Sequence, residues 1–168
     1  MVIKLRKWET EDAEALAKNL NNKKIQDNLR DGLAYPFTVS DAEAFIAATK
    51  AADESKEYVW AIIVDDKVAG SIGVYRRDSQ YFRTAEIGYY VAEEYWGKGI
   101  MTEAVKQACT YIFENTDIVR ISADPFIYNT ASHRVLEKAG FSYEGTLRSN
   151  AIKGGKIIDM KLYAIVRE

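Results

Sequence analysis

Two glycines in the segment Trp96-Gly97-Lys98-Gly99 follow a strand-like run and precede a long amphipathic stretch. Glycine lets the main chain adopt a positive φ and approach a ligand closely. Free backbone N–H groups at the start of a helix, together with the helix dipole, favour a phosphate or pyrophosphate. The glycines alone are equally consistent with a plain turn, and their spacing fits neither the dinucleotide-binding nor the ATP-binding glycine loop.

The elements that must position this loop follow from apolar periodicity and turn residues. The order β-α-α-β-β-β-α-β-α-β-β predicts an α+β fold, in which helices pack on a mixed sheet. Ser40 and Glu43 match a capping box at the start of the second helix, and Gly140 should cap the end of the last helix. We predict strands over residues 2–8, 58–64, 68–75, 84–91, 118–123, 141–151 and 156–166, and helices after residues 12, 39, 99 and 128.

Length and composition restrict the class of protein. The 168 residues favour one domain, residues 1–168. A formal net charge of −2 argues against a general nucleic-acid binder. One cysteine, Cys109, and one histidine, His133, make a metal site unexpected. We expect no membrane helix, because no apolar run approaches the roughly 20 residues required. We also expect no signal peptide and a cytoplasmic location.

Four segments of the chain resemble the GNAT acyltransferase superfamily and, within it, the RimJ/RimL-like branch of ribosomal-protein-alanine N-acetyltransferases. The resemblance extends over essentially the whole chain and implies a mostly antiparallel sheet, split between its fourth and fifth strands and flanked by about four helices. The matching segments are AEIGYYV (85–91), YWGKGIMTEA (95–104), N-x-x-S-x-x-x-x-x-K-x-G-F (129–141) and YEGTLR (143–148).

The resemblance implies acetyl-coenzyme A as co-substrate and an amine as acceptor. It places the pantetheine arm in the split between the strands and the pyrophosphate on main-chain N–H groups of the glycine loop. The cofactor-binding positions that it implies are Tyr89, Val91, Trp96, Gly97, Lys98, Gly99, Ile100, Met101, Thr102, Asn129 and Ser132.

One residue departs from the superfamily pattern. Glu94 stands three residues before the first glycine, where the superfamily usually has Gln or Arg. A carboxylate repels phosphate, so we expect no side-chain contact there and a site built on main-chain groups. Lys98 could add a phosphate contact or be a solvated lysine.

The acceptor must react as a neutral amine. At pH 7.4 a lysine amine, with a pKa of about 10.4, costs roughly 4 kcal/mol to deprotonate, whereas an α-amine near 7.7–8.0 costs under about 1 kcal/mol. A protein N-terminus therefore needs only a weak base. A polyamine, amino sugar or antibiotic is the alternative acceptor, and a non-catalytic coenzyme A-binding module is the alternative of another class.

Ser132 and Glu86 are the candidate catalytic residues. By resemblance, Ser132 hydrogen-bonds the departing thiolate; otherwise its hydroxyl satisfies N–H groups of the first helical turn. Glu86, on the strand bordering the split, is the candidate base, acting through water; otherwise it pairs with Arg83 or Arg120. Tyr128 is the alternative candidate for the general acid, although we expect it to pack on the sheet.

The remaining candidates are assigned weaker roles. His133 should point about 100° away from Ser132 on the helix, so we expect a surface histidine. Asp159 and Tyr163 match the family pattern on the last strand, without an assigned role.

The acceptor end of the cleft should lie between the loop at residues 28–37 and the hairpin at residues 149–156. Arg30 and Tyr35 are the candidate acceptor contacts, although Tyr35 and Phe37 are more simply explained as anchors of the loop. A homodimer is compatible with the sequence.

Overall fold

The computed structural model describes residues 1–167. Its sheet has seven strands in the order β1-β2-β3-β4-β5-β7-β6, and only β4 and β5 pair in parallel. The predicted α+β fold is confirmed. The strands are β1 (Ile3–Lys7), β2 (Glu57–Val64), β3 (Lys67–Arg76), β4 (Thr84–Val91), β5 (Arg120–Ala123), β6 (Ser142–Lys153) and β7 (Lys156–Val166).

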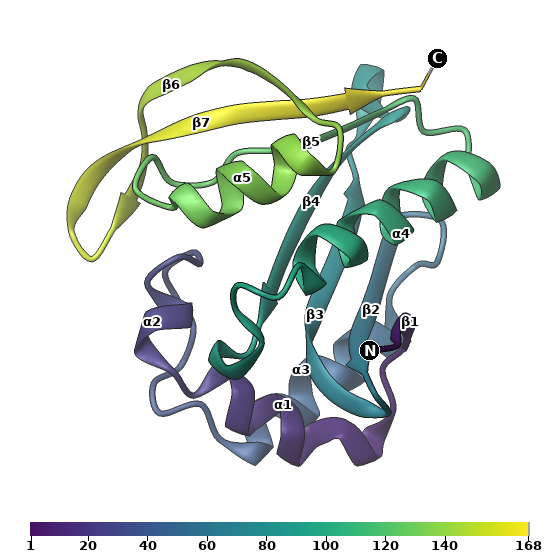
Figure 1. Cartoon of the computed structure of the whole chain (residues 1–168), viewed down its shortest axis with the longest axis vertical. Coiled ribbons are helices and arrows are strands. Elements are labelled where there is room, and N and C mark those ends of the chain that lie inside the picture. Colours follow the sequence, from purple (N-terminus) through teal and green to yellow (C-terminus); the bar gives the residue numbers. More distant parts are fainter. Residues whose placement is uncertain (168) are drawn as a thin grey trace.

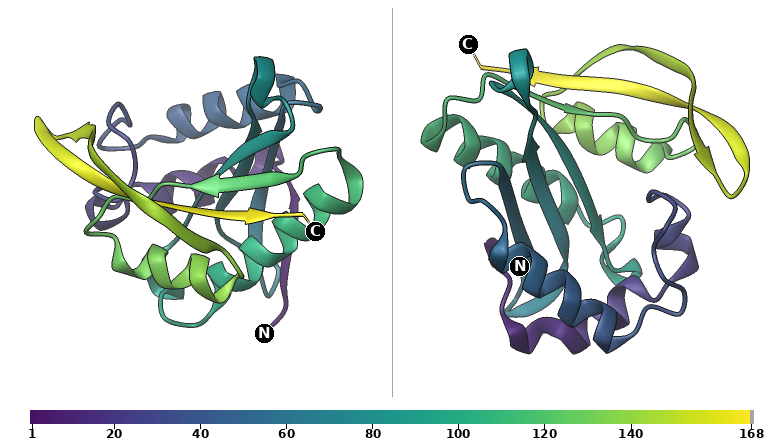
Figure 2. Two further views of the ribbon diagram at one scale, coloured as in Figure 1. Left: turned by 90° about the horizontal axis from the view of Figure 1, so that it is seen from above. Right: turned by 180° about the vertical axis from the view of Figure 1, so that it is seen from behind.

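Helices cover both faces of the sheet (Figures 1 and 2). Strand β2 shows why: Ala61 and Ile63 pack against α1 and α3, while Ile62 and Val64 turn to the side of α4, as strand alternation requires. The described residues form α1 (Ala13–Leu20), α2 (Lys23–Gln26), α3 (Val39–Ala51), α4 (Ile100–Asn115) and α5 (Thr130–Lys138).

The sheet divides where β4 meets β5. The parallel ladder pairs residues 84–86 with residues 120–122 and then ends. Beyond it, β4 continues to Val91, whereas β5 ends at Ala123. In Figure 1, β5, β7, β6 and α5 turn away from the lower half of β4. The predicted split is therefore present, and it begins after the third residue pair of the β4–β5 ladder.

Two local predictions differ from the structure. The capping box of α3 is formed by Thr38 and Asp41, not by Ser40 and Glu43: Thr38 Oγ1 accepts from the Asp41 N–H at 3.1 Å, and Asp41 accepts from the Thr38 N–H at 2.8 Å. Helix α2, capped by Asn22, was not predicted because one turn is too short to show apolar periodicity. Gly140 does cap α5, with φ of +97°.

Candidate functional site

The glycine loop joins a short 3-10 turn (Glu93–Tyr95) to α4. Gly97 and Gly99 have φ of +73° and +75°, in the left-handed region that favours glycine. A Cβ added at either position would meet nothing within 4 Å. Within residues 1–167 no side-chain cap hydrogen bond is made at this end of α4, so its first N–H groups have no intrahelical or capping partner there. The loop thus fits a phosphate group approaching from outside.

The side chains of the loop play different parts. Trp96 fixes the loop to the end of β4, because its Nε1–H donates to the Val91 carbonyl at 3.1 Å. Ile100 and Met101 are buried in the core, so their expected contact with a ligand is limited to the main chain. Lys98 is exposed, with its Nζ 5.9 Å from the centre of the Tyr95 ring.

Ser132 lies opposite β4 at the start of α5. Its Oγ is 2.6 Å from the hydroxyl oxygen of Tyr89, and its N–H donates to Asn129 Oδ1 at 3.3 Å. Asn129 is thus the N-cap of α5. The first-turn N–H of Ser132 is satisfied by Asn129, and the serine hydroxyl itself makes a contact across the split. The alternative in which Ser132 serves only as a capping hydroxyl therefore does not describe this geometry.

Glu86 lies at the point where β4 and β5 separate, with its side chain exposed. The two arginines expected to pair with it have other partners within residues 1–167. Arg83 Nε donates to the Asp117 carbonyl at 2.9 Å, and Arg120 Nη2 lies 2.6 Å from Glu144 Oε1. The salt-bridge alternative was wrong, and the Glu86 carboxylate remains available to a ligand.

Asp124, which follows β5, was missed by the sequence reasoning. Burial raises the pKa of its carboxyl, and the nearby charge of Glu86 raises that pKa further. In the parallel register Glu86 lies opposite Ser122, the last residue pair of the ladder, and Asp124 follows two residues later. On β4, Gly88 follows Glu86 beyond the ladder, and an added Cβ there would meet nothing within 4 Å. Two carboxylates thus border the split near an open stretch of β4.

His133 was expected at the surface and is buried, with 5% of its surface exposed. Its ring stacks on Tyr163 with centroids 5.8 Å apart, and its Nε2 lies 3.2 Å from the Phe126 carbonyl. The His133 side chain does point away from Ser132, as predicted, but β7 covers that side of α5. Burial, and the charge of Lys161, lower the pKa of His133.

Tyr128 does not pack on the sheet as expected. Its side chain is 47% exposed, its ring lies beside Phe126, and its hydroxyl donates to the Asp27 carbonyl. It therefore links the start of α5 to the segment that follows α2.

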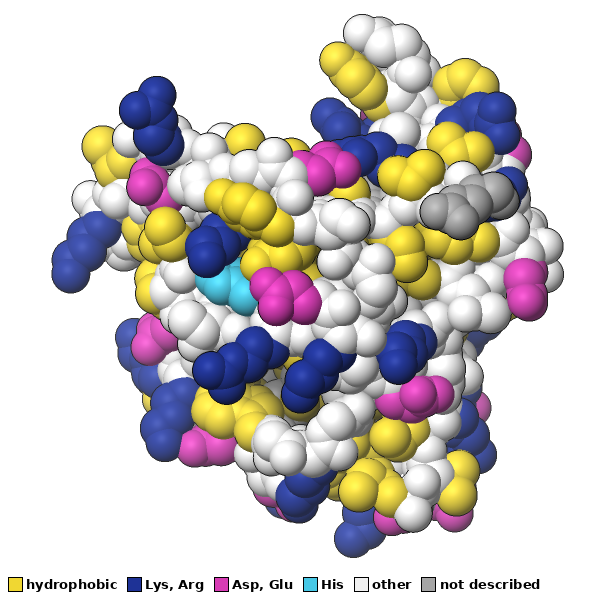
Figure 3. Space-filling view, turned by 45° about the horizontal axis from the view of Figure 1, so that its top comes forward, with side chains coloured by type: hydrophobic (Ala, Val, Ile, Leu, Met, Phe, Trp, Pro, Cys, Tyr) yellow, Lys and Arg dark blue, Asp and Glu magenta, His cyan; other side chains and the backbone are white. Residues whose placement is uncertain are grey.

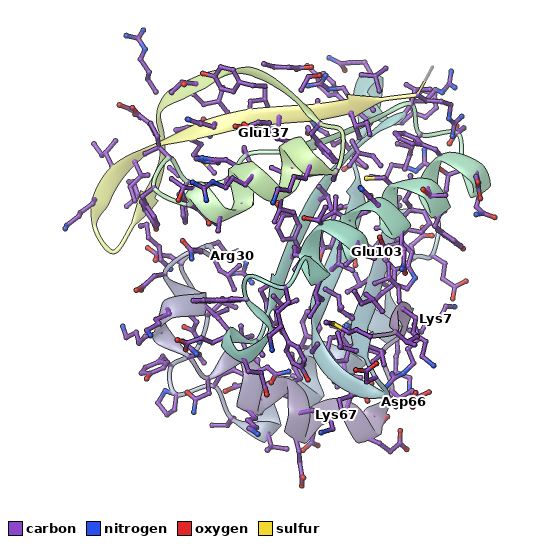
Figure 4. The ribbon with its side chains drawn as sticks, viewed as in Figure 1. Lys7, Arg30, Asp66, Lys67, Glu103 and Glu137 are labelled. Atoms are coloured by element: carbon purple, nitrogen blue, oxygen red, sulfur yellow. The ribbon has the colours of Figure 1, made fainter. Side chains whose placement is uncertain are left out.

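The loop after α2 and the β6–β7 hairpin contact each other. Asp31 accepts from the Gly154 N–H at 3.1 Å and lies 3.3 Å from Lys153 Nζ. Figure 4 shows Arg30 on this loop, on the side turned toward α5. Phe37 is buried and anchors the loop, whereas Tyr35 is 53% exposed and is not an anchor.

Asp159 and Tyr163 have structural contacts. Asp159 Oδ1 accepts from the Ser149 N–H at 2.7 Å, at the irregular stretch of β6. The Tyr163 hydroxyl donates to Glu137 Oε1 at 3.0 Å. These residues hold β6 and α5 against β7.

Basic side chains gather on one face of the molecule. On the face in Figure 3, Lys and Arg side chains form a row across the middle, below the cyan histidine. Among residues 1–167, no group of three or more His, Cys, Asp and Glu side chains could hold a metal ion. Within the same range, no helix has the length and apolar character needed to cross a membrane.

Comparison with known proteins decides the family. The protein-family model described as an acetyltransferase (GNAT) domain matches residues 3–142 of the chain. The chain belongs to the GNAT acetyltransferase family. GNAT enzymes use acetyl-coenzyme A, and the chain is an N-acetyltransferase that acts on an amine.

Individual relatives agree with the RimJ/RimL-like branch. The chain is 37% identical to the probable N-acetyltransferase YjcK of Bacillus subtilis over 116 residues, 68% of this chain and 64% of that protein. It is 31% identical to the putative ribosomal N-acetyltransferase YdaF of the same organism, over 98% of this chain and 91% of that protein. Mycobacterium smegmatis RimJ, solved with CoA-disulfide, superimposes with a TM-score of 0.90 at 26% identity, covering 98% and 82% of the two chains.

Proposed function

We propose that this GNAT enzyme acetylates the N-terminal α-amine of a protein. The observation that carries the proposal is the environment of Glu86: the carboxylate is exposed, at the point where β4 and β5 separate, and its expected arginine partners are occupied elsewhere. An exposed carboxylate is a weak base. It suits an acceptor that is already largely neutral near pH 7.4, as an α-amine is and a lysine amine is not.

The donor side of the proposal assigns acetyl-coenzyme A to the split and the glycine loop. Main-chain N–H groups from Gly97 to Thr102 would bind the pyrophosphate, and backbone groups near Tyr89 and Val91 would pair with the pantetheine arm. The left-handed glycines and the open space around them support this assignment.

In the transfer step, the chain's own groups act at three places. An N–H near Val91 stabilises the developing oxyanion. Ser132 donates a hydrogen bond to the sulfur as the C–S bond breaks. Glu86 accepts, through water, the proton that the amine loses.

The acceptor contacts of the proposal come from the loop that follows α2. Arg30 and Tyr35 lie on the loop that meets the β6–β7 hairpin, and the exposed Tyr35 ring stands 5.2 Å from Lys23 Nζ. YdaF, a putative ribosomal N-acetyltransferase by name, also supports a protein acceptor.

A small cationic amine is the second candidate acceptor. It is favoured by one specific observation, the carboxylates of Glu86 and Asp124 beside the open stretch at Gly88. Such a pair attracts a polyamine more strongly than a peptide terminus, because a polyamine carries several positive charges.

Acetylation of matched peptides separates these acceptors. The enzyme, acetyl-coenzyme A and a peptide with a free N-terminus and one lysine should release thiol, and mass spectrometry should locate the acetyl group on the α-amine. The same peptide with a blocked N-terminus is the control and should release none. Faster release with spermidine than with any free peptide would reject the protein N-terminus as acceptor.

A further inference from the structure

The contact between Tyr89 and Ser132 joins the two elements that border the split. Tyr89 belongs to β4 and Ser132 to α5, 43 residues later, and their hydroxyl oxygens lie 2.6 Å apart. This is a short O–H···O hydrogen bond. Ser132 is 8% exposed, so water competes little for its hydroxyl.

The structure allows either hydroxyl to donate this hydrogen bond, and the chemistry of the two groups favours one direction. A hydroxyl has one hydrogen to donate and two lone pairs that accept. Burial raises the pKa of Tyr89, so its phenol keeps its hydrogen throughout the working pH range. A phenol is also the more acidic of the two groups and hence the better donor. When Tyr89 donates to Ser132 Oγ, the hydrogen of Ser132 is left free for a second partner.

We propose that Tyr89 is a positioning residue that, by donating to Ser132 Oγ, turns the serine hydrogen toward the sulfur of the acyl donor. This inference rests on the role of Ser132 in the proposed function. As the C–S bond breaks, its electron pair stays on sulfur, and the serine O–H stabilises that charge. Tyr89 exchanges no proton; it fixes the hydroxyl and polarises it, because hydrogen bonds in a chain strengthen one another.

Tyr90 offers a matched control on the same strand. It is the next residue, its hydroxyl is buried, and within residues 1–167 that hydroxyl has no hydrogen-bond partner. Successive strand residues face opposite sides, and Tyr90 packs with the α1–α3 side of the core. Tyr90→Phe therefore removes a buried phenolic oxygen without touching Ser132.

The first measurement needs no acceptor. The ionisation of the coenzyme A thiol bound to the enzyme is followed by thiolate absorbance against pH, with desulfo-coenzyme A as the blank. Tyr89→Phe and Ser132→Ala should both raise the thiol pKa, and Tyr90→Phe should leave it unchanged. An unchanged thiol pKa in Tyr89→Phe would overturn the proposal.

The second measurement is a double-mutant cycle on turnover. Tyr89→Phe should lower kcat about tenfold, the worth of one hydrogen bond, with KM for acetyl-coenzyme A unchanged. In the Ser132→Ala background the same substitution should have no further effect. An equal loss in both backgrounds would show that Tyr89 acts independently of Ser132 and would overturn the proposal. Ser132→Ala tests the same hydrogen bond if Tyr89→Phe does not fold.

The two measurements also separate this inference from the proposed function. A raised thiol pKa in both variants supports the hydrogen bond even if no peptide is acetylated at its N-terminus. If the enzyme acetylates a peptide N-terminus but Tyr89→Phe keeps the wild-type thiol pKa, the proposed function stands and the role of Tyr89 is rejected.

Discussion

Replacing Gly99 by alanine tests the phosphate site with a single methyl group. Gly99 has φ of +75°, and an added Cβ would meet no protein atom within 4 Å. The protein therefore tolerates the methyl sterically and loses only backbone energy, about 1–2 kcal/mol for an alanine in the left-handed region. The same space is where a phosphate would lie against the first N–H groups of α4, so the methyl group displaces the ligand.

The expected loss of affinity is a separate effect from this backbone cost. A hydrogen bond to a charged group contributes about 1.5–3 kcal/mol, so losing one such contact weakens coenzyme A binding about tenfold to a hundredfold. Isothermal titration calorimetry with coenzyme A measures that change, and urea unfolding measures the backbone cost separately.

Gly155→Ala supplies the matched control. Gly155 lies in the turn between β6 and β7, has φ of +77° and is equally open around the added Cβ. Both variants should lose the same 1–2 kcal/mol or so of stability, and only Gly99→Ala should lose affinity. Equal coenzyme A affinities of the two variants would refute the assignment of the phosphate site.

Three further substitutions test the titratable groups. Glu86→Gln should lower kcat about a hundredfold, most strongly at low pH where other bases are scarce, and an unchanged pH–rate profile would reject Glu86 as base. Asp124→Asn should raise the free energy of unfolding at pH 7: the pKa of Asp124 is raised in the folded state, so wild-type stability falls as pH rises through that pKa. Urea unfolding at pH 7 and near pH 3 measures this gain, which should vanish at the lower pH; a loss at pH 7 would contradict it. His133 has a lowered pKa, so wild-type stability should fall as pH drops below about 6.5, and His133→Gln should show a smaller fall in thermal melts between about pH 7 and pH 5.

The sequence predicted the parts of the site that depend on local geometry. Glycine at positions 97 and 99 indicated left-handed backbone because few other residues adopt it, and both angles agree. The three-residue ladder between β4 and β5 agrees with the implied split.

Features that depend on tertiary partners were not predictable. Ser40-x-x-Glu43 matches the usual capping-box pattern, whereas the box that forms is Thr38-x-x-Asp41, two residues earlier. The burial of His133 depends on β7, because Tyr163 covers the side of α5 that helical geometry alone leaves to solvent.

Asp124 was missed for a similar reason. It approaches Glu86 only through the parallel register of two strands that are far apart in the chain. The spacing of neighbouring residues in the sequence does not indicate that two such carboxylates will lie close together in the fold.

The contact between Asp31 and Gly154 has a consequence for biosynthesis. It joins residues 123 positions apart, and contacts of such sequence separation close late because chain entropy opposes them. During synthesis the N-terminal elements emerge first, and the loop at Asp31 must wait for the β6–β7 hairpin. The contact can thus form only after Gly154 has left the ribosome.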